Sequence, residues 1–141
     1  MDKLTDKILG CAVRVSKGLG TGFLEKVYEN ALCMELREAG LLFQRQHPIS
    51  IWYRENVVGE YVTDILVEQA VILELKAANT IDRIHEAQLL NYLRATGVQK
   101  GLILNFGTPR LGIRRMVLTR PSSKPANPSA SSVSSAVSTS F

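Results

Sequence analysis

Two neighbouring runs decide the expected fold: Tyr61-Val-Thr-Asp-Ile-Leu-Val67 and Val71-Ile-Leu-Glu-Leu-Lys76. Both are rich in β-branched and apolar residues, which favour strands. Because only a short turn separates them, we expect the two runs to pair as an antiparallel hairpin. Such a hairpin can bring Asp64 beside Glu74. Glu74 and Lys76 leave the same face of their strand, since successive side chains alternate.

Two carboxylates and an ammonium group on one patch form a candidate magnesium site. Mg²⁺ prefers oxygen ligands, keeps several waters and usually takes one or two protein carboxylates. Such an ion lowers the pKa of a bound water and neutralises charge that develops on a phosphate. Lys76 can position that water or the phosphate oxygens. The alternative is a cross-strand salt bridge at a sheet edge, and the trio alone leaves both interpretations open.

The remaining elements follow from apolar periodicity and turn residues. A first helix carries Leu4, Ile8, Cys11 and Val15 on one face and ends in the glycine-rich turn at residues 18–22. A second helix, ended by Gly40, has a broad apolar face made of Phe23, Leu24, Val27, Tyr28, Ala31, Leu32 and Leu36. The later elements are expected as strands over 49–53, 59–67 and 70–75, a helix over 81–96, and strands over 101–106 and 113–118. The order ααβββαββ predicts an α/β fold with a mixed sheet flanked by helices.

Composition and length bound the organisation of the chain. The 141 residues suffice for one domain, expected over 1–120. Residues 121–141 are dominated by Ser, Ala and Pro, which predicts a disordered tail. No apolar run approaches the roughly 20 residues of a membrane helix, so a cytoplasmic location is expected. Cys11 and Cys33 are expected to be small buried residues without a disulfide bond.

Charge is divided unevenly along the sequence. Residues 1–86 carry ten Lys or Arg and thirteen Asp or Glu, a net charge of −3, whereas residues 87–141 carry seven Lys or Arg and no acid, a net charge of +7. A basic surface near an acidic site would suit a polyanion held against a metal centre. Arg110, Arg114 and Arg115 are the expected contacts to a nucleic-acid backbone. The alternative is a surface that only keeps the protein soluble.

Two helical patterns add to the hairpin. Glu25 lies at the flank of the second helix's apolar face, and His85, Gln88 and Tyr92 form one stripe on the later helix. Gly22-Phe-Leu-Glu-Lys-Val-Tyr28 matches the motif G-x-x-E-x-x-Y, and the sequence over residues 84–107 also resembles the GxxExxY protein family that this motif names. That family is similar to the PD-(D/E)xK nuclease superfamily, and within it to the RecB and lambda-exonuclease branch.

The resemblance implies a restriction-endonuclease-like core and a role for each matching residue. Asp64, Glu74 and the Leu75 carbonyl would hold Mg²⁺ or Mn²⁺, with Glu25 as an outer metal ligand. Lys76 would position the water, and Gln88 and Tyr92 would orient the site or contact DNA. One departure is Thr63, which stands where the superfamily motif has a proline before the aspartate.

The expected function is therefore metal-dependent hydrolysis of nucleic-acid phosphodiesters. DNA is the preferred substrate, although the sequence does not separate DNA from RNA. A homodimer or a partner protein would supply further substrate contacts, because the chain is small for a self-sufficient nuclease. Two alternatives stay open: a nucleic-acid-binding module that does not cleave, and a scaffold or regulatory domain with a residual site.

Overall fold

Helices and strands follow one another in the order that the sequence predicts. The computed structural model describes residues 2–119, so the tail predicted at 121–141 lies outside the described residues. The elements are α1 (Lys3–Leu19), α2 (Glu25–Glu38), β1 (Phe43–Tyr53), β2 (Asn56–Val67), β3 (Val71–Lys76), α3 (Arg83–Thr96), β4 (Lys100–Asn105) and β5 (Gly112–Val117). The α/β fold and the order ααβββαββ are confirmed.

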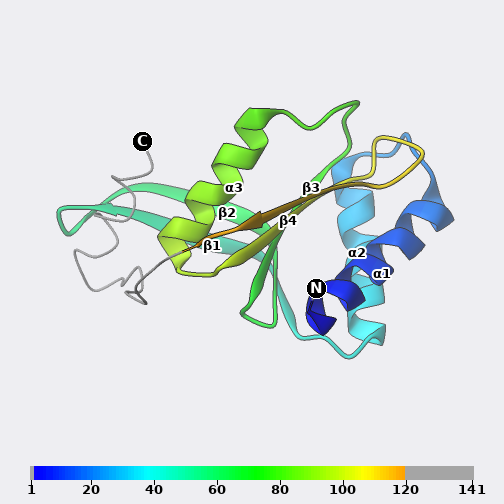
Figure 1. Ribbon diagram of the computed structural model, residues 1–141, viewed down its shortest axis with the longest axis horizontal. Coiled ribbons are helices and arrows are strands. Elements are labelled where there is room, and N and C mark those ends of the chain that lie inside the picture. The colour runs from blue at the N-terminus through cyan, green and yellow to red at the C-terminus, as the bar shows by residue number, and fades with distance from the viewer. Residues whose placement is uncertain (1, 120–141) are drawn as a thin grey trace.

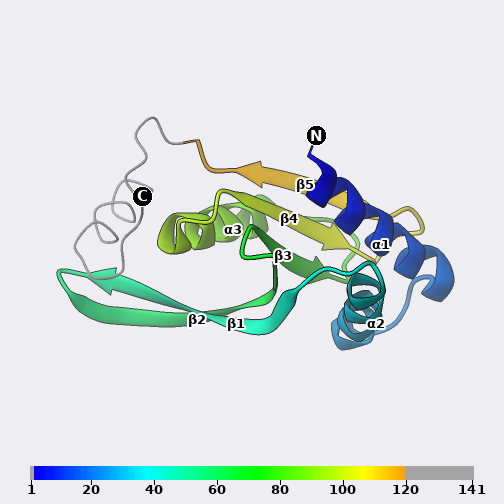
Figure 2. The ribbon, with the colours of Figure 1, turned by 90° about the horizontal axis from the view of Figure 1, so that it is seen from below.

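The five strands form one mixed sheet in the order β1-β2-β3-β4-β5 (Figure 2). The first three strands are an antiparallel meander, and β5 returns antiparallel to β4. Only β3 and β4 run parallel, with Lys76 beside Asn105. A parallel pair requires a crossover connection, and α3 supplies it. The carboxyl ends of β3 and β4 therefore lie at the same end of the sheet.

Helices cover the sheet from two sides (Figure 1). The core beneath α1 and α2 contains Leu73 and Leu75 of β3, whereas Ile72 belongs to the core beneath α3. Because side chains alternate along a strand, Glu74 and Lys76 extend from β3 on the α3 side. Cys11 and Cys33 are buried without a disulfide bond, as predicted. Among the described residues, no helix has the length and apolar character needed to cross a membrane.

The hairpin of β1 and β2 extends beyond the other strands as a two-stranded arm, which both ribbon views show (Figures 1 and 2). Its pairing runs over ten residue pairs, whereas β2 pairs with β3 only over Ile65–Val67. The ladder continues on both sides of Pro48, because a proline is tolerated on an edge strand such as β1.

Two expectations from the sequence require correction. Strand β1 begins at Phe43 rather than at residue 49, because pairing with β2 holds a polar segment that has no apolar alternation. The apolar face of α2 is also narrower than predicted. Phe23 and Leu24 are exposed because they lie before the helix begins. Val27 is exposed because it lies on the face of α2 opposite the buried residues Tyr28, Leu32 and Leu36.

Candidate metal site

The candidate site lies where β2 and β3 separate. Their ladder ends at the pair Ile65 and Leu73, and Asp64 and Glu74 come next. The Thr63 hydroxyl and the Asp64 amide (3.3 Å) both donate hydrogen bonds to Glu74 Oε2. The Leu75 amide donates to Asp64 Oδ2 at 2.7 Å. The two carboxylates therefore occupy the gap between the strands, as the hairpin predicted from the sequence allows.

An irregularity in the arm explains why consecutive residues of β2 reach this gap. Gln46 of β1 has φ +51°, and the paired positions on either side of it skip Gln46 and Asp64. Ile65 packs beneath α1 and α2, whereas Ile49, the partner of Tyr61, packs beneath α3. Regular alternation would put residues 61 and 65 on one face. The side chains of β2 therefore exchange faces of the sheet at Asp64, which brings both Thr63 and Asp64 toward Glu74.

The backbone of Leu75 offers a third oxygen at the same gap. Its amide points toward β2, as the hydrogen bond to Asp64 shows. The amide and carbonyl of one residue in an extended strand point to the same side, so the Leu75 carbonyl also faces the β2 side. Two carboxylates and one carbonyl match the oxygen ligands of Mg²⁺, which fills its remaining positions with water.

Burial and like charge act on both carboxyl groups. Burial, and next the charge of Asp64, raise the pKa of Glu74 to about 7. Burial also raises the pKa of Asp64, and the charges of Glu29 and Glu25 add to it, although the hydrogen bond from Leu75 opposes the rise. The Lys76 ammonium lowers the pKa of both groups and is the weakest of these influences. Negative charge is thus in excess here, and a divalent cation would relieve it.

Contacts between the ends of β3 and β4 fix the start of the segment that follows Lys76. The Phe106 amide donates to the Lys76 carbonyl at 2.8 Å. The buried Asn105 side chain accepts from the Ala78 amide (3.0 Å) and donates to the Ala78 carbonyl (2.9 Å). A Cβ atom at Gly107 would overlap the Ala78 backbone, so only glycine allows this approach. Lys76 is therefore held at a fixed end of its strand.

Helix α3 brings one of its two predicted residues to the carboxylates. Tyr92 is 5% exposed, and burial, followed by the charges of Glu74, Tyr61 and Asp64, raises the pKa of Tyr92 to about 12. Gln88 lies one turn earlier and is exposed, and within residues 2–119 no hydrogen bond joins it to the carboxylates. His85 is used differently: its ring accepts from the Asp82 amide at the start of α3.

Helix α2 holds the predicted outer carboxylate, Glu25, and one carboxylate that the sequence did not single out. Glu25 is exposed, and its charge reaches Asp64 more weakly than that of Glu29. Within residues 2–119, no three Asp, Glu, His or Cys side chains are arranged to hold a metal ion together. The structure thus brings Asp64 and Glu74 together but does not bring Glu25 into a group of three with them.

Glu29 is 4% exposed on α2 and ties this helix to β1. It accepts hydrogen bonds from Arg45 (3.0 Å) and Gln46 (3.1 Å), and Lys26 lies 3.3 Å away. Gln46 has a left-handed backbone conformation and lies opposite Asp64 in the β1–β2 pair. By accepting a hydrogen bond from Gln46, Glu29 stabilises this irregular point of the pair. In the sequence, Glu29 looks like any helix-surface glutamate, because its partners lie 16 and 17 residues later.

Tyr28 of the G-x-x-E-x-x-Y motif lies in the core beneath α1 and α2, not at the candidate metal site. Its fully buried ring stacks on Phe106, with ring centroids 4.8 Å apart. Its hydroxyl donates to the Gly20 carbonyl at 2.6 Å and accepts from the Phe23 amide at 3.3 Å. The tyrosine therefore fastens the turn before α2 to the core, and this turn sets where Glu25 begins the helix.

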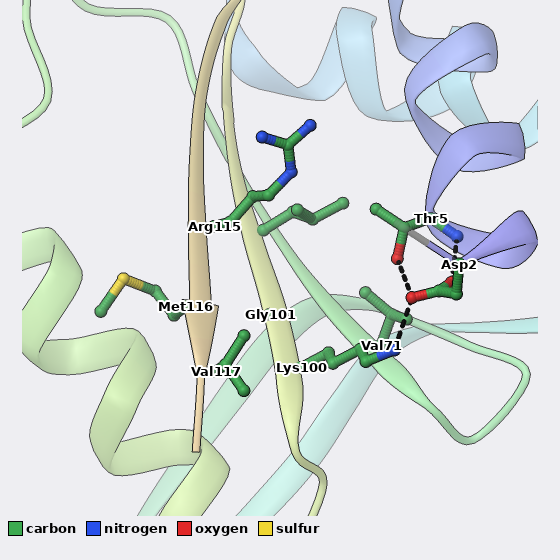
Figure 3. A pocket seen from close by; sticks show the side chains of 9 residues that line it. Asp2, Thr5, Val71, Lys100, Gly101, Arg115, Met116 and Val117 are labelled. Atoms are coloured by element: carbon green, nitrogen blue, oxygen red, sulfur yellow. Dashed lines mark hydrogen bonds and ion pairs between the residues drawn. The ribbon is translucent and has the colours of Figure 1, made fainter. Parts of the chain in front are cut away.

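The three arginines expected to grip a phosphate backbone do not form one patch. Arg114 lies 3.2 Å from Glu86 of α3, whereas Arg115 lines a pocket with Asp2, Thr5 and Lys100 (Figure 3). Consecutive residues of β5 point to opposite faces, so Arg114 and Arg115 do not lie on the same surface. Arg110 is exposed in the loop after β4, at the end of the sheet where Lys76 lies.

Comparisons with known proteins identify the family. The sequence pattern of the PD-(D/E)XK nuclease superfamily matches residues 2–116. Curated proteins give no match. The crystal structure of SSO0001 is similar, with a TM-score of 0.51 and 17% identity over 67% of this chain and 50% of that one, so this chain spans half of its length. An alkaline exonuclease from Laribacter hongkongensis, LHK-Exo, has a TM-score of 0.49 and 15% identity over 84% of this chain and 73% of its own. On the strength of the match over residues 2–116, the chain belongs to the PD-(D/E)XK nuclease superfamily.

Proposed function

We propose that this protein is a divalent-metal-dependent nuclease that hydrolyses phosphodiester bonds, and that it belongs to the GxxExxY family near the RecB and lambda-exonuclease branch. The observation that carries the proposal is the meeting of two carboxylates at the end of the β2–β3 ladder. The Leu75 amide donates to Asp64 Oδ2 and the Asp64 amide donates to Glu74 Oε2, which fixes both groups. Membership of the superfamily supports a nucleic-acid substrate.

The proposed metal ligands are Asp64, Glu74 and the Leu75 carbonyl, with Mg²⁺ or Mn²⁺ as the ion and Glu25 as an outer ligand. When bound, the ion would supply an acidified water and neutralise charge on the phosphate. Lys76 extends from the same strand and face as Glu74, so its ammonium can donate to a phosphate oxygen or orient the attacking water. Removal of Lys76 would therefore slow the reaction more than it weakens metal binding.

The remaining proposed roles are binding and orientation. The Tyr92 hydroxyl is protonated at neutral pH, and burial and nearby carboxylates raise its pKa further, to about 12. It can therefore act as a hydrogen-bond donor toward the substrate or a bound water. Gln88 is exposed one turn away and can contact the nucleic acid. Arg110 is exposed at the same end of the sheet as Lys76, so it can contact a phosphate there.

A cleavage assay tests the proposal directly. Single- and double-stranded DNA and RNA are incubated with the protein in Mg²⁺, in Mn²⁺ and in EDTA. We expect cleavage of at least one substrate in the presence of metal and none in EDTA. Salt-sensitive binding without cleavage in every metal would instead indicate a binding module, and neither binding nor cleavage would indicate a scaffold.

A further inference from the structure

Tyr61 is an exposed aromatic residue beside the candidate metal site. It lies on β2 three residues before Asp64, a distance of about 10 Å along an extended strand. Its side chain is 49% exposed, and its ring centroid lies 5.7 Å from that of Tyr92, tilted by 48°. Its cross-strand partner Ile49 packs beneath α3. Tyr61 therefore shares the α3 side of the sheet with Glu74 and Lys76.

The contact with Tyr92 connects Tyr61 to the site. Tyr92, whose ring lies against that of Tyr61, is itself influenced by the charges of Glu74 and Asp64. The buried Tyr92 backs one side of the Tyr61 ring, while about half of the Tyr61 side chain remains open to solvent. A flat, half-exposed ring that lies on the same side of the sheet as the candidate site is available to a ligand that the site binds.

The charge of the arm indicates which part of a nucleic acid would lie there. Residues 47–62 contain one arginine and two glutamates, so the arm offers no excess of positive charge to phosphates. Its exposed side chains also include five apolar or aromatic ones, Tyr53, Val57, Val58, Tyr61 and Val62. A neutral aromatic ring binds the face of a nucleobase by stacking. The arm therefore suits bases rather than backbone.

We propose that Tyr61 stacks on an unpaired nucleobase close to the bond that is cleaved, so that the substrate is single-stranded nucleic acid or a frayed end. The bases inside a duplex have both faces covered by their stacked neighbours, so this ring could reach only an unpaired or terminal base. The inference rests on the proposed function, because it names the substrate class of the same site.

Fluorescence of 2-aminopurine tests the stacking without any cleavage. The full-length protein is titrated, in buffer without divalent metal, into single-stranded oligonucleotides that carry 2-aminopurine at one position each. We expect quenching in the wild type at one or two adjacent positions, the same quenching in Tyr61→Phe, and its loss in Tyr61→Ala. Loss of one stacked base should weaken binding by about tenfold.

Tyr53→Ala is the matched control, because Tyr53 is 50% exposed on the same arm but lies at its far end, opposite Asn56. It should bind and quench like the wild type. Melting temperatures of all variants exclude unfolding as the cause of a loss. In the presence of Mg²⁺, Tyr61→Ala should raise the KM for single strands about tenfold, while kcat at saturation changes little.

Several results would overturn the proposal. These are unchanged quenching in Tyr61→Ala, an absence of oligonucleotide binding by the wild type, and equal Tyr61 dependence for a blunt duplex. A change from dimer to monomer in Tyr61→Ala with quenching intact would show that the arm is an interface between copies. Tyr61-dependent quenching without cleavage in any metal would support the stacking surface while the proposed catalytic function fails.

Discussion

Replacement of Glu74 by glutamine should make the metal-free protein more stable at alkaline pH. Glu74 is 9% exposed and lies beside Asp64, and its carboxylate accepts hydrogen bonds from the Thr63 hydroxyl and the Asp64 amide through one oxygen. A glutamine amide oxygen can accept the same two bonds in nearly the same volume. Glu74→Gln therefore removes the buried charge without removing its hydrogen-bond partners.

The size of the effect follows from the pKa of Glu74, which rises from 4.5 to about 7 on folding. The folded state holds this proton more tightly than the unfolded state, so stability falls as pH rises from about 4.5 to about 7. Each pKa unit corresponds to about 1.4 kcal/mol, so the loss above pH 7 is about 3 kcal/mol. Glutamine does not titrate, so the variant escapes this loss.

Thermal unfolding in EDTA between pH 5 and pH 8.5 measures the effect. At pH 5 the wild type and Glu74→Gln should melt within a few degrees of each other, because Glu74 is then mostly protonated. At pH 8 the variant should melt higher, by roughly 10 °C for a gain of about 3 kcal/mol in a domain of this size. A difference in melting temperature that stays constant across this pH range would refute the account of Glu74.

Three further predictions concern the metal, the loop and the tail. Millimolar Mg²⁺ or Mn²⁺ should stabilise the wild type, by about 2.7 kcal/mol at a hundredfold excess over Kd, and so raise its melting temperature. Differential scanning fluorimetry should show that Asp64→Asn folds but loses most of this metal-dependent rise. A full rise in Asp64→Asn would exclude Asp64 as a ligand. Gly107→Ala should lower the free energy of unfolding, measured by urea titration, by about 1–3 kcal/mol, because the new Cβ overlaps the Ala78 backbone. Gly18→Ala is the control: its new Cβ in α1 meets no atom within 4 Å, so the same titration should show a neutral or stabilising effect. Truncation after residue 120 should leave the melting temperature unchanged if the Ser-, Ala- and Pro-rich segment adds nothing to the core, and a loss of several degrees would show that it packs on the domain.

The elements were predictable because each is encoded by nearby residues. Apolar periodicity marks α1, and the glycines at 40 and 97, both with positive φ, mark the ends of α2 and α3. The mixed sheet also followed, since a helix between two apolar strands predicts a parallel crossover. The start of β1 was missed for the opposite reason. Residues 43–48 have no strand pattern of their own and become a strand only by pairing with β2.

The site was predictable in part. The proximity of Asp64 and Glu74 depends on a short hairpin, which local sequence encodes. The exchange of side-chain faces at Gln46 and the burial of Glu29 depend on contacts between α2 and β1, which the spacing of residues in the sequence does not reveal. The separation of Arg114 from Arg115 follows from strand alternation. It could have been inferred from the predicted strand over 113–118.

The most direct test of the central claim compares cleavage by the wild type with cleavage by Lys76→Ala in Mg²⁺ or Mn²⁺. Lys100→Ala is the matched control, since Lys100 pairs with Asp2 at the opposite end of the sheet. We expect the wild type and Lys100→Ala to cleave equally, and Lys76→Ala to lose cleavage while it keeps the metal-dependent rise in melting temperature. Cleavage by Lys76→Ala at the wild-type rate would contradict the account.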